Sequence, residues 1–174
     1  SLGAYHLAKT LCDHLNEVQP GIISDEDTDL VSIAALLHDI GHPPFSHLLE
    51  TDKVFANFHS HEDWGKMMLE SEETEIGAAI REVLGQKRTG RLFALYSGKS
   101  EYEGEEIAPF LREIVSSQLD VDRMDYLLRD IKMTGLNYGV EIYQIMKDSL
   151  ITKNIRNQQQ IIFKDKSYIQ VHNF

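Results

Sequence analysis

The sequence has 174 residues, 42% of them hydrophobic, and a formal net charge of −11, which suits one domain with a sizeable core. Its single cysteine, Cys12, excludes an internal disulfide and a cysteine-based zinc site, and it favours a reducing, cytoplasmic compartment. The acidity makes nucleic acid an improbable partner, because broad binding needs many cations to neutralise phosphates. No stretch has the ~20 uninterrupted apolar residues of a membrane helix, so no membrane partner is expected.

Helical periodicity governs the first part of the chain. Apolar residues recur every three or four positions over 2–18 and predict a first helix that ends near Pro20-Gly21. A second helix is predicted over 29–40, with its cap among residues 25–28. Its centre is almost entirely apolar, which indicates a buried helix. Gly41 and the two prolines that follow end it, because proline removes a backbone donor and clashes with the preceding turn.

The remaining elements are shorter. Ser60 is the predicted N-cap of a helix that reaches residue 70, since acidic residues occupy its first turn. Beyond residue 152, apolar residues over 160–163 and 168–171 flank a polar turn and predict a β-hairpin. Further helices are predicted over 45–50, 74–84, 105–119, 121–133 and 141–151, and a polar loop around a short helix is predicted over 86–104. The predicted fold class is therefore mainly α, with a helical core over 1–151 and the start of a β-containing extension over 152–174.

Both ends suggest a fragment of a longer protein. Ser1-Leu2-Gly3 resembles the interior of a helix already under way, and the alternating pattern before Phe174 stops where it would be expected to continue. We therefore expect the helical core to be truncated at its N-terminus.

The dipeptide His38-Asp39 is the first candidate for chemistry. It stands at the end of a very apolar helix, where a buried carboxylate without a partner is unfavourable. Imidazole and carboxylate are both common ligands of divalent cations, so the pair predicts a metal site. His42 shares a helical face with His38 if the turn continues. Gly41 would let the backbone come close to a ligand, and it is also a simple helix stop.

A second candidate is the polar stripe of the helix predicted over 121–133. At about 100° per residue, Asp122, Tyr126 and Asp130 share one side, with Arg123 at its edge. A solvated face of an amphipathic helix is the simpler interpretation. The apolar segment before it instead favours a helix inside a bundle, where Asp122 could add a ligand to His38-Asp39.

Together these segments resemble the HD-domain phosphohydrolases. The segment His38-Asp39-Ile40-Gly41-His42-Pro43-Pro44-Phe45-Ser46-His47 is similar to the central motif of that family. It looks most like the branch that hydrolyses deoxynucleoside triphosphates (dNTPs) to a deoxynucleoside and inorganic triphosphate. Residues 120–126 resemble a later motif of that branch, Ser60-His61-Glu62 its third histidine site, and Ser1-Leu2-Gly3 its opening helix. The resemblance spans residues 1 to about 140 and implies an HD-domain helical bundle.

The resemblance also implies roles for individual residues. The metal ligands would be His38, Asp39 and Asp122, the catalytic residues His42, His47 and His61, and the substrate-binding residues Arg123, Tyr126 and Asp130. A fourth ligand of the family, a histidine directly before Ser-Leu-Gly, would precede Ser1. These ligands fit Fe, Mn, Ni, Zn or Mg, and a further Mg could bridge the phosphates. The family also implies a homo-oligomer with regulatory nucleotides between subunits.

Three alternatives keep parts of this interpretation. The substrate could be a nucleoside monophosphate, a guanosine tetraphosphate or a cyclic dinucleotide. The domain could instead sense nucleotides without hydrolysing them, with an incomplete metal site. A nuclease is disfavoured by the acidity, although a local basic groove would permit one. The stripe with Asp122 and Tyr126 favours the dNTP branch among these.

Overall fold

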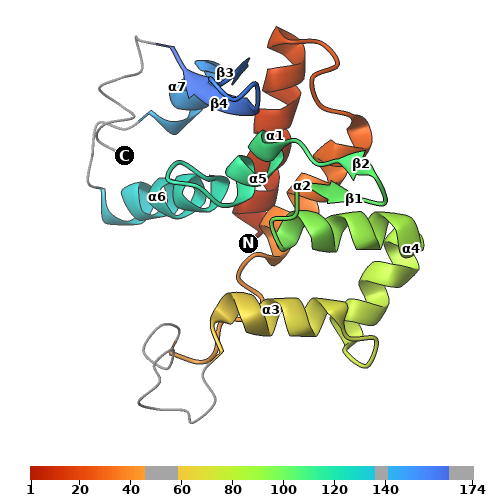
Figure 1. Ribbon diagram of the computed structural model, residues 1–174. Coiled ribbons are helices and arrows are strands. Elements are labelled where there is room, and N and C mark those ends of the chain that lie inside the picture. Colours follow the sequence, from red (N-terminus) through yellow and green to blue (C-terminus); the bar gives the residue numbers. More distant parts are fainter. Residues whose placement is uncertain (46–58, 136–140, 165–174) are drawn as a thin grey trace.

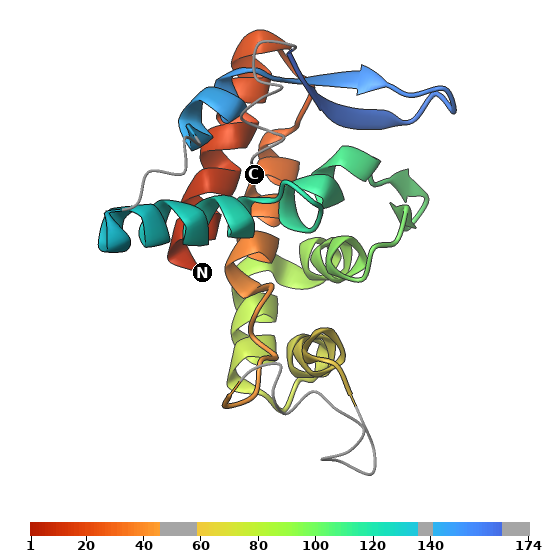
Figure 2. The same ribbon diagram turned by 90° about the vertical axis from the view of Figure 1, so that its left-hand side faces the viewer.

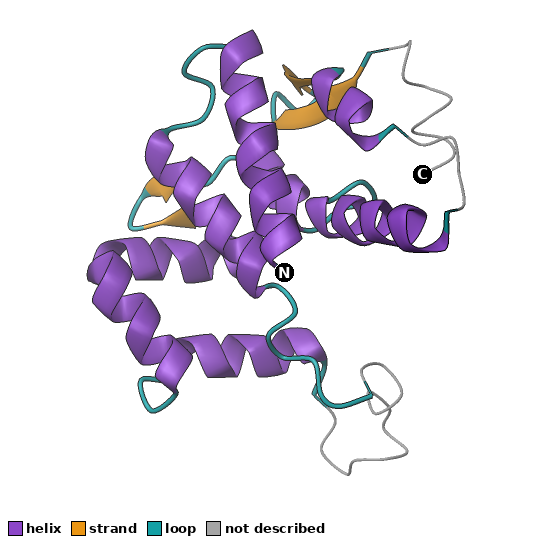
Figure 3. Ribbon diagram, turned by 180° about the vertical axis from the view of Figure 1, so that it is seen from behind, coloured by secondary structure: helices purple, strands orange, loops and turns teal. Residues whose placement is uncertain are grey.

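The structure, a computed structural model, describes residues 1–45, 59–135 and 141–164. Within these ranges helices dominate, and the strands form only small antiparallel hairpins (Figures 1 and 3), which confirms the predicted mainly α fold. The helices are α1 (Leu2–Val18), α2 (Asp25–Leu37), α3 (His61–Glu70), α4 (Glu75–Tyr96), α5 (Pro109–Val115), α6 (Val121–Thr134) and α7 (Ile142–Lys147). Strand β1 (Glu101–Tyr102) pairs with β2 (Glu105–Glu106), and β3 (Ser149–Lys153) pairs with β4 (Gln159–Phe163). No described helix has the length and apolar character needed to cross a bilayer.

The core is centred on α1 and α2, which pack along each other. Small residues on both helices, Ala8 on α1 and Ala34 on α2 among them, are 0% exposed, so the two backbones can approach closely. Larger apolar residues such as Leu15 and Val31 fill the remaining space. A bulkier side chain at Ala34 would overpack this contact, at a cost of about 1–3 kcal/mol.

Two units lie at opposite ends of this helix pair. The β3–β4 hairpin lies at one end and the elbow of α3 with the first half of α4 lies at the other, as the blue and gold segments of Figure 2 show. The Gln19 side chain holds the hairpin to α1 by donating to the Ile151 carbonyl at 2.9 Å and accepting from its N–H at 2.6 Å. On the α5 side, the Ile161 N–H donates to the Glu113 carboxylate at 2.9 Å. The hairpin is therefore docked by paired polar contacts.

The predicted bounds were wrong for two helices in the first half. Helix α2 begins at Asp25 rather than residue 29, because the Ser24 hydroxyl caps it by accepting from the Asp27 N–H at 3.0 Å. It ends at Leu37, so His38 is its C-cap. Helix α4 continues to Tyr96 through the predicted loop, with a kink at Gly85, where φ is 72°. Burial of Leu92 and Leu95 in the core outweighs the polar, glycine-containing local sequence.

The later segments also differ from expectation. Only residues 109–115 of the predicted 105–119 helix are helical. Helix α7 stops at Lys147, where the Ser149 hydroxyl donates to the Met146 carbonyl at 2.6 Å, and the chain then forms β3. The hairpin partner of β4 is thus β3, whereas the predicted strand at 168–171 lies outside the described residues. So does the predicted helix at 45–50 apart from its first residue, and the division at 151/152 stays a prediction.

Candidate metal centre and cleft

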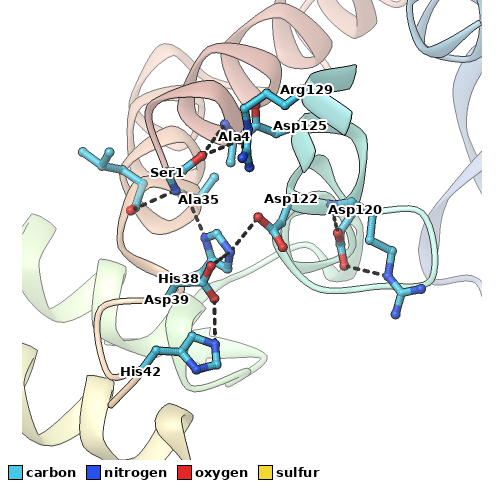
Figure 4. Close-up of polar contacts among 12 residues, drawn as sticks. Ser1, Ala4, Ala35, His38, Asp39, His42, Asp120, Asp122, Asp125 and Arg129 are labelled. Carbon is cyan, nitrogen blue, oxygen red and sulfur yellow. Dashed lines mark hydrogen bonds and ion pairs between the residues drawn. The ribbon is translucent and has the colours of Figure 1, made fainter. Parts of the chain in front are cut away.

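Three predicted ligands meet where the end of α2 faces the start of α6. The Nε2 atom of His38 lies 3.0 Å from Asp39 Oδ2 and 3.1 Å from Asp122 Oδ1 (Figure 4). One ligand atom from each of the three residues lies within 4.8 Å of the others. This spacing forms a group that could hold a metal ion, since one imidazole and two carboxylates would neutralise a divalent cation.

The orientation of His38 fits that use. Its Nδ1 atom lies 2.7 Å from the Ala35 carbonyl, which can only accept, so Nδ1 carries the hydrogen. The neutral ring then turns the lone pair of Nε2 toward the carboxylates. The Nε2 atom is buried. Two carboxylate oxygens lie close to it, but none of the described residues makes a hydrogen bond of acceptable angle with it. A buried polar atom in that position is well suited to a cation.

The charges of the metal-free group are strongly coupled. Burial alone would lower the pKa of His38, but the carboxylates of Asp122 and Asp39 outweigh it and raise the pKa to about 10. His38 in turn holds the pKa of Asp39 below its usual range. Without a metal, the two carboxylates favour the protonated form of the His38 ring. A bound divalent cation would take the place of that proton.

Local helix capping places Asp122 in the group. Asp120 is the N-cap of α6, where its Oδ1 accepts from the Arg123 N–H at 2.9 Å and its Oδ2 accepts from the Ser117 N–H at 3.1 Å. The cap fixes the entry of the chain into α6, so Asp122 stands in the first helical turn. A carboxylate is favoured there by the helix dipole as well as by the neighbouring His38.

Two further histidines form the facing wall. The rings of His42 and His61 stack with centroids 4.0 Å apart and planes 12° from parallel, and His42 Nε2 lies 3.3 Å from Asp39 Oδ1. Gly41 makes this stacking possible, because a Cβ there would overlap the His61 carbonyl and the Gly65 nitrogen. The structure therefore shows a close approach of Gly41 to α3, and an approach of its backbone to a ligand stays a prediction.

A cleft of about 670 Å³ opens over these residues. Its lining includes seven residues predicted from sequence: His38, Asp39, His42, His61, Asp122, Arg123 and Tyr126. Asp130 is exposed two turns beyond Asp122 and is not part of the lining, and His47 lies outside the described residues.

Several cleft residues were missed from sequence. Tyr96 donates to the His38 carbonyl at 3.2 Å, and burial raises the pKa of its hydroxyl to about 12. Lys66 and Arg112 add cations to the lining, and Glu62 adds a carboxylate. No local pattern singled these residues out, except that Glu62 directly follows His61.

Comparisons with known proteins agree with this geometry. A family model described as "HD domain" matches residues 1–130. The chain is 33% identical to an uncharacterized protein of Mycoplasma pneumoniae over all of its own length and 40% of that protein. It is 29% identical to the human deoxynucleoside triphosphate triphosphohydrolase SAMHD1 over 95% of its own length and 30% of the relative. The chain thus spans well under half of these curated relatives.

A solved structure extends the likeness to the fold. The crystal structure of a phosphohydrolase from Bacteroides thetaiotaomicron superposes with a TM-score of 0.74 at 29% sequence identity. The superposition covers 99% of this chain and 37% of that one. Because the family match runs over residues 1–130 and the fold agrees, the chain belongs to the HD-domain phosphohydrolase superfamily.

Proposed function

We propose that this chain carries a metal-dependent phosphohydrolase site that converts dNTPs to a deoxynucleoside and inorganic triphosphate. The convergence of His38, Asp39 and Asp122 on one edge of a 670 Å³ cleft carries the proposal. Protein clefts that bind small molecules span ~300–1,000 Å³. A cleft of about 670 Å³ is therefore large enough for a nucleotide. The printed activity of the SAMHD1 relatives supports the choice of substrate.

The three ligands would hold a divalent ion through one nitrogen and two carboxylate oxygens. When bound, such an ion supplies stabilisation of phosphate charge and a more acidic water. The backbone nitrogen of Ser1 lies 3.3 Å from the Ala35 carbonyl, one turn before His38. A residue preceding Ser1 would therefore lie near the group, where the family resemblance expects its histidine ligand. Fe, Mn, Ni, Zn and Mg all remain compatible with these donors, and a further Mg could accompany the phosphates.

The facing wall would handle the leaving group. We assign proton donation to the departing 5′ oxygen to the His42 and His61 pair, whose stacked rings line the cleft. The Asp39 carboxylate, 3.3 Å from His42 Nε2, would hold that ring in place. We also assign His47 to the catalytic histidines, as the family resemblance implies.

The start of α6 would bind the nucleotide. Arg123 would contact phosphate oxygens, and Tyr126, 38% exposed at the cleft, would stack on the sugar. Lys66 and Arg112 add two cations that could contact further phosphate oxygens, beside the carboxylates of Glu62, Asp63 and Asp120. Contact of Asp130 with the sugar, homo-oligomer formation and regulation by nucleotides stay predictions.

A product assay tests the proposal. The complete protein is incubated with each dNTP and each ribonucleotide in the presence of single metals, and the products are separated by ion-exchange chromatography. We expect deoxynucleoside and inorganic triphosphate in equal amounts, and none after chelation of the metal. Release of pyrophosphate or of single phosphates would contradict the assigned reaction.

A further inference from the structure

A polar link joins the two elements that carry the candidate ligands. The Ser1 hydroxyl donates to Asp125 Oδ2 at 2.5 Å (Figure 4). Asp125 lies on α6, one turn beyond Asp122, and is only 6% exposed. It does not line the cleft, so the proposed chemistry leaves this buried carboxylate without a role.

The other side of Ser1 faces α2. Its backbone nitrogen lies 3.3 Å from the Ala35 carbonyl, and that same carbonyl accepts from His38 Nδ1 at 2.7 Å. Ser1 is therefore in contact with the atom that orients the His38 ring, and also with the carboxylate one turn from Asp122. The start of α1 is placed between both ligand-bearing elements.

Packing at Gly3 gives this junction little freedom. A Cβ at that position would overlap the Asp125 carboxylate, so α1 and α6 are in direct contact there. Arg129 approaches the same carboxylate at 3.1 Å from the solvent side, and its side chain is 59% exposed. Because the Arg129 end of this ion pair is exposed, solvent screens it, and its contribution is discounted toward the ~0–1 kcal/mol of surface pairs. Arg129 donates from within α6 itself, whereas the part-buried hydrogen bond from Ser1 joins α6 to α1.

We propose that Ser1 and Asp125 are positioning residues that set the separation of His38 and Asp122 and thereby the affinity for the divalent ion. The inference rests on the proposed metal site. Groups behind metal ligands typically change metal affinity about 10–100-fold when they are removed. This part-buried hydrogen bond at 2.5 Å restrains α6 against α1 in the arrangement that places Asp122 beside His38.

A second serine provides a matched control. Ser24 is the N-cap of α2 as Ser1 is of α1, and its hydroxyl donates to Asp27 Oδ2 at 2.9 Å. Asp27 is paired with Arg91 at 2.8 Å, as Asp125 is with Arg129. This second Ser-Asp-Arg set stands at the opposite end of α2 from His38 and does not line the cleft. Ser24→Ala and Asp27→Ala therefore remove a serine-aspartate contact of the same chemistry away from the ligands, within one helix rather than between two.

The test measures Mn²⁺ binding by isothermal titration calorimetry on the complete protein, together with the thermal midpoint. We expect Ser1→Ala and Asp125→Ala to raise the Kd about 10–100-fold, and both controls to leave it unchanged. Asp125→Asn keeps an acceptor oxygen and should recover most of the affinity. If Asp125→Ala does not fold, Ser1→Ala decides alone. Equal Kd values for Ser1→Ala and Ser24→Ala would overturn the proposal.

A crystal structure of Ser1→Ala gives a readout independent of the metal. We expect the separation of His38 Nε2 and Asp122 Oδ1 to exceed the 3.1 Å of the intact chain, whereas an unchanged separation would overturn the positioning role. A wild-type protein that binds Mn²⁺ tightly but releases no triphosphate would contradict the assigned reaction. The positioning role would stand in that case.

Discussion

The two walls of the cleft are built differently. The ligand wall, which carries the proposed metal ligands, is formed by the end of α2 and the start of α6. It rests on core helices and on the hydrogen bond of Ser1 with Asp125. The histidine wall is formed by α3 and by His42, which lies on the turn after α2 and stacks on His61. Helix α3 packs mainly on α4, and its Trp64 is 43% exposed. The walls meet where Gly41 crosses Gly65 and where the Tyr96 hydroxyl reaches the His38 carbonyl.

We expect this difference to separate metal binding from turnover. Precise ligand geometry needs rigid, well-packed supports, and the ligand wall has them. The histidine wall has fewer buried contacts and belongs to the less stable part of the molecule. Changes in α3 should therefore alter turnover while metal affinity is retained, whereas changes at the ligand wall should alter both.

The largest effect is expected for Asp122→Ala. Loss of a carboxylate ligand should weaken metal binding by more than the ~10–100-fold that is typical of supporting groups and abolish hydrolysis. Circular dichroism should still show a helical protein, because Asp122 is only partly buried. Unchanged metal affinity and turnover would exclude Asp122 from the site.

The next effect tests the opposite wall. His61→Ala should lower turnover by about 10²–10⁴-fold, the usual contribution of a general acid or base, and leave the Kd of the metal unchanged. His6→Ala is the control, since His6 lies exposed on α1 outside the cleft lining. Parallel losses of metal affinity and turnover in His61→Ala would show that the walls do not act separately.

A smaller effect, on the free energy of unfolding, is expected at the contact between the two walls. Tyr96→Phe removes the hydroxyl that donates to the His38 carbonyl and should lower the free energy of unfolding by about 1 kcal/mol. Tyr102→Phe is the comparison, because the hydroxyls of Tyr96 and Tyr102 pack over the helix glycines Gly65 and Gly90, and Tyr102 lies outside the cleft lining with the exposed Glu103 as its hydrogen-bond partner. Urea unfolding of both variants gives the comparison, and equal stabilities would remove Tyr96 as a link.

The smallest effect concerns the core at the start of α2, where Cys12 lies beside Thr28. Cys12 is 0% exposed, and burial raises the pKa of its thiol to about 12 from 9.0. The folded state thus favours the neutral thiol, and stability from this group is lost only as the pH rises from 9 toward 12. At pH 8 the native protein should not react with a disulfide reagent, and guanidinium should restore the reaction. Rapid labelling of the native protein would show that this core opens as readily as α3.

Local chemistry made some features predictable. The N-cap at Ser60 follows from the acidic first turn, and the structure adds the reciprocal contact with Asp63 that completes a capping box. The polar stripe with Asp122 and Tyr126 follows from helix periodicity. The contact of His38 with Asp122 is harder to predict, because the two residues are 84 positions apart in sequence and packing brings them together. Only the resemblance to the family motifs indicated it.

The features that were missed depend on distant contacts. Tyr96 lies in a polar segment that becomes helical only when its apolar residues join the core. The partner of β4 precedes it rather than follows it, since β3 is held by Gln19 of α1. Asp125 could not be distinguished from other polar residues of α6, because only the packing of Gly3 and Ser1 makes it a buried residue.

The most direct test of a metal centre is a crystal grown with Mn²⁺ and measured for anomalous scattering. We expect one strong anomalous peak bonded to His38 Nε2 and to carboxylate oxygens of Asp39 and Asp122, and loss of this peak in Asp122→Ala. A peak held by other residues, or no peak at a saturating concentration of the ion, would show that these three residues do not form the metal centre.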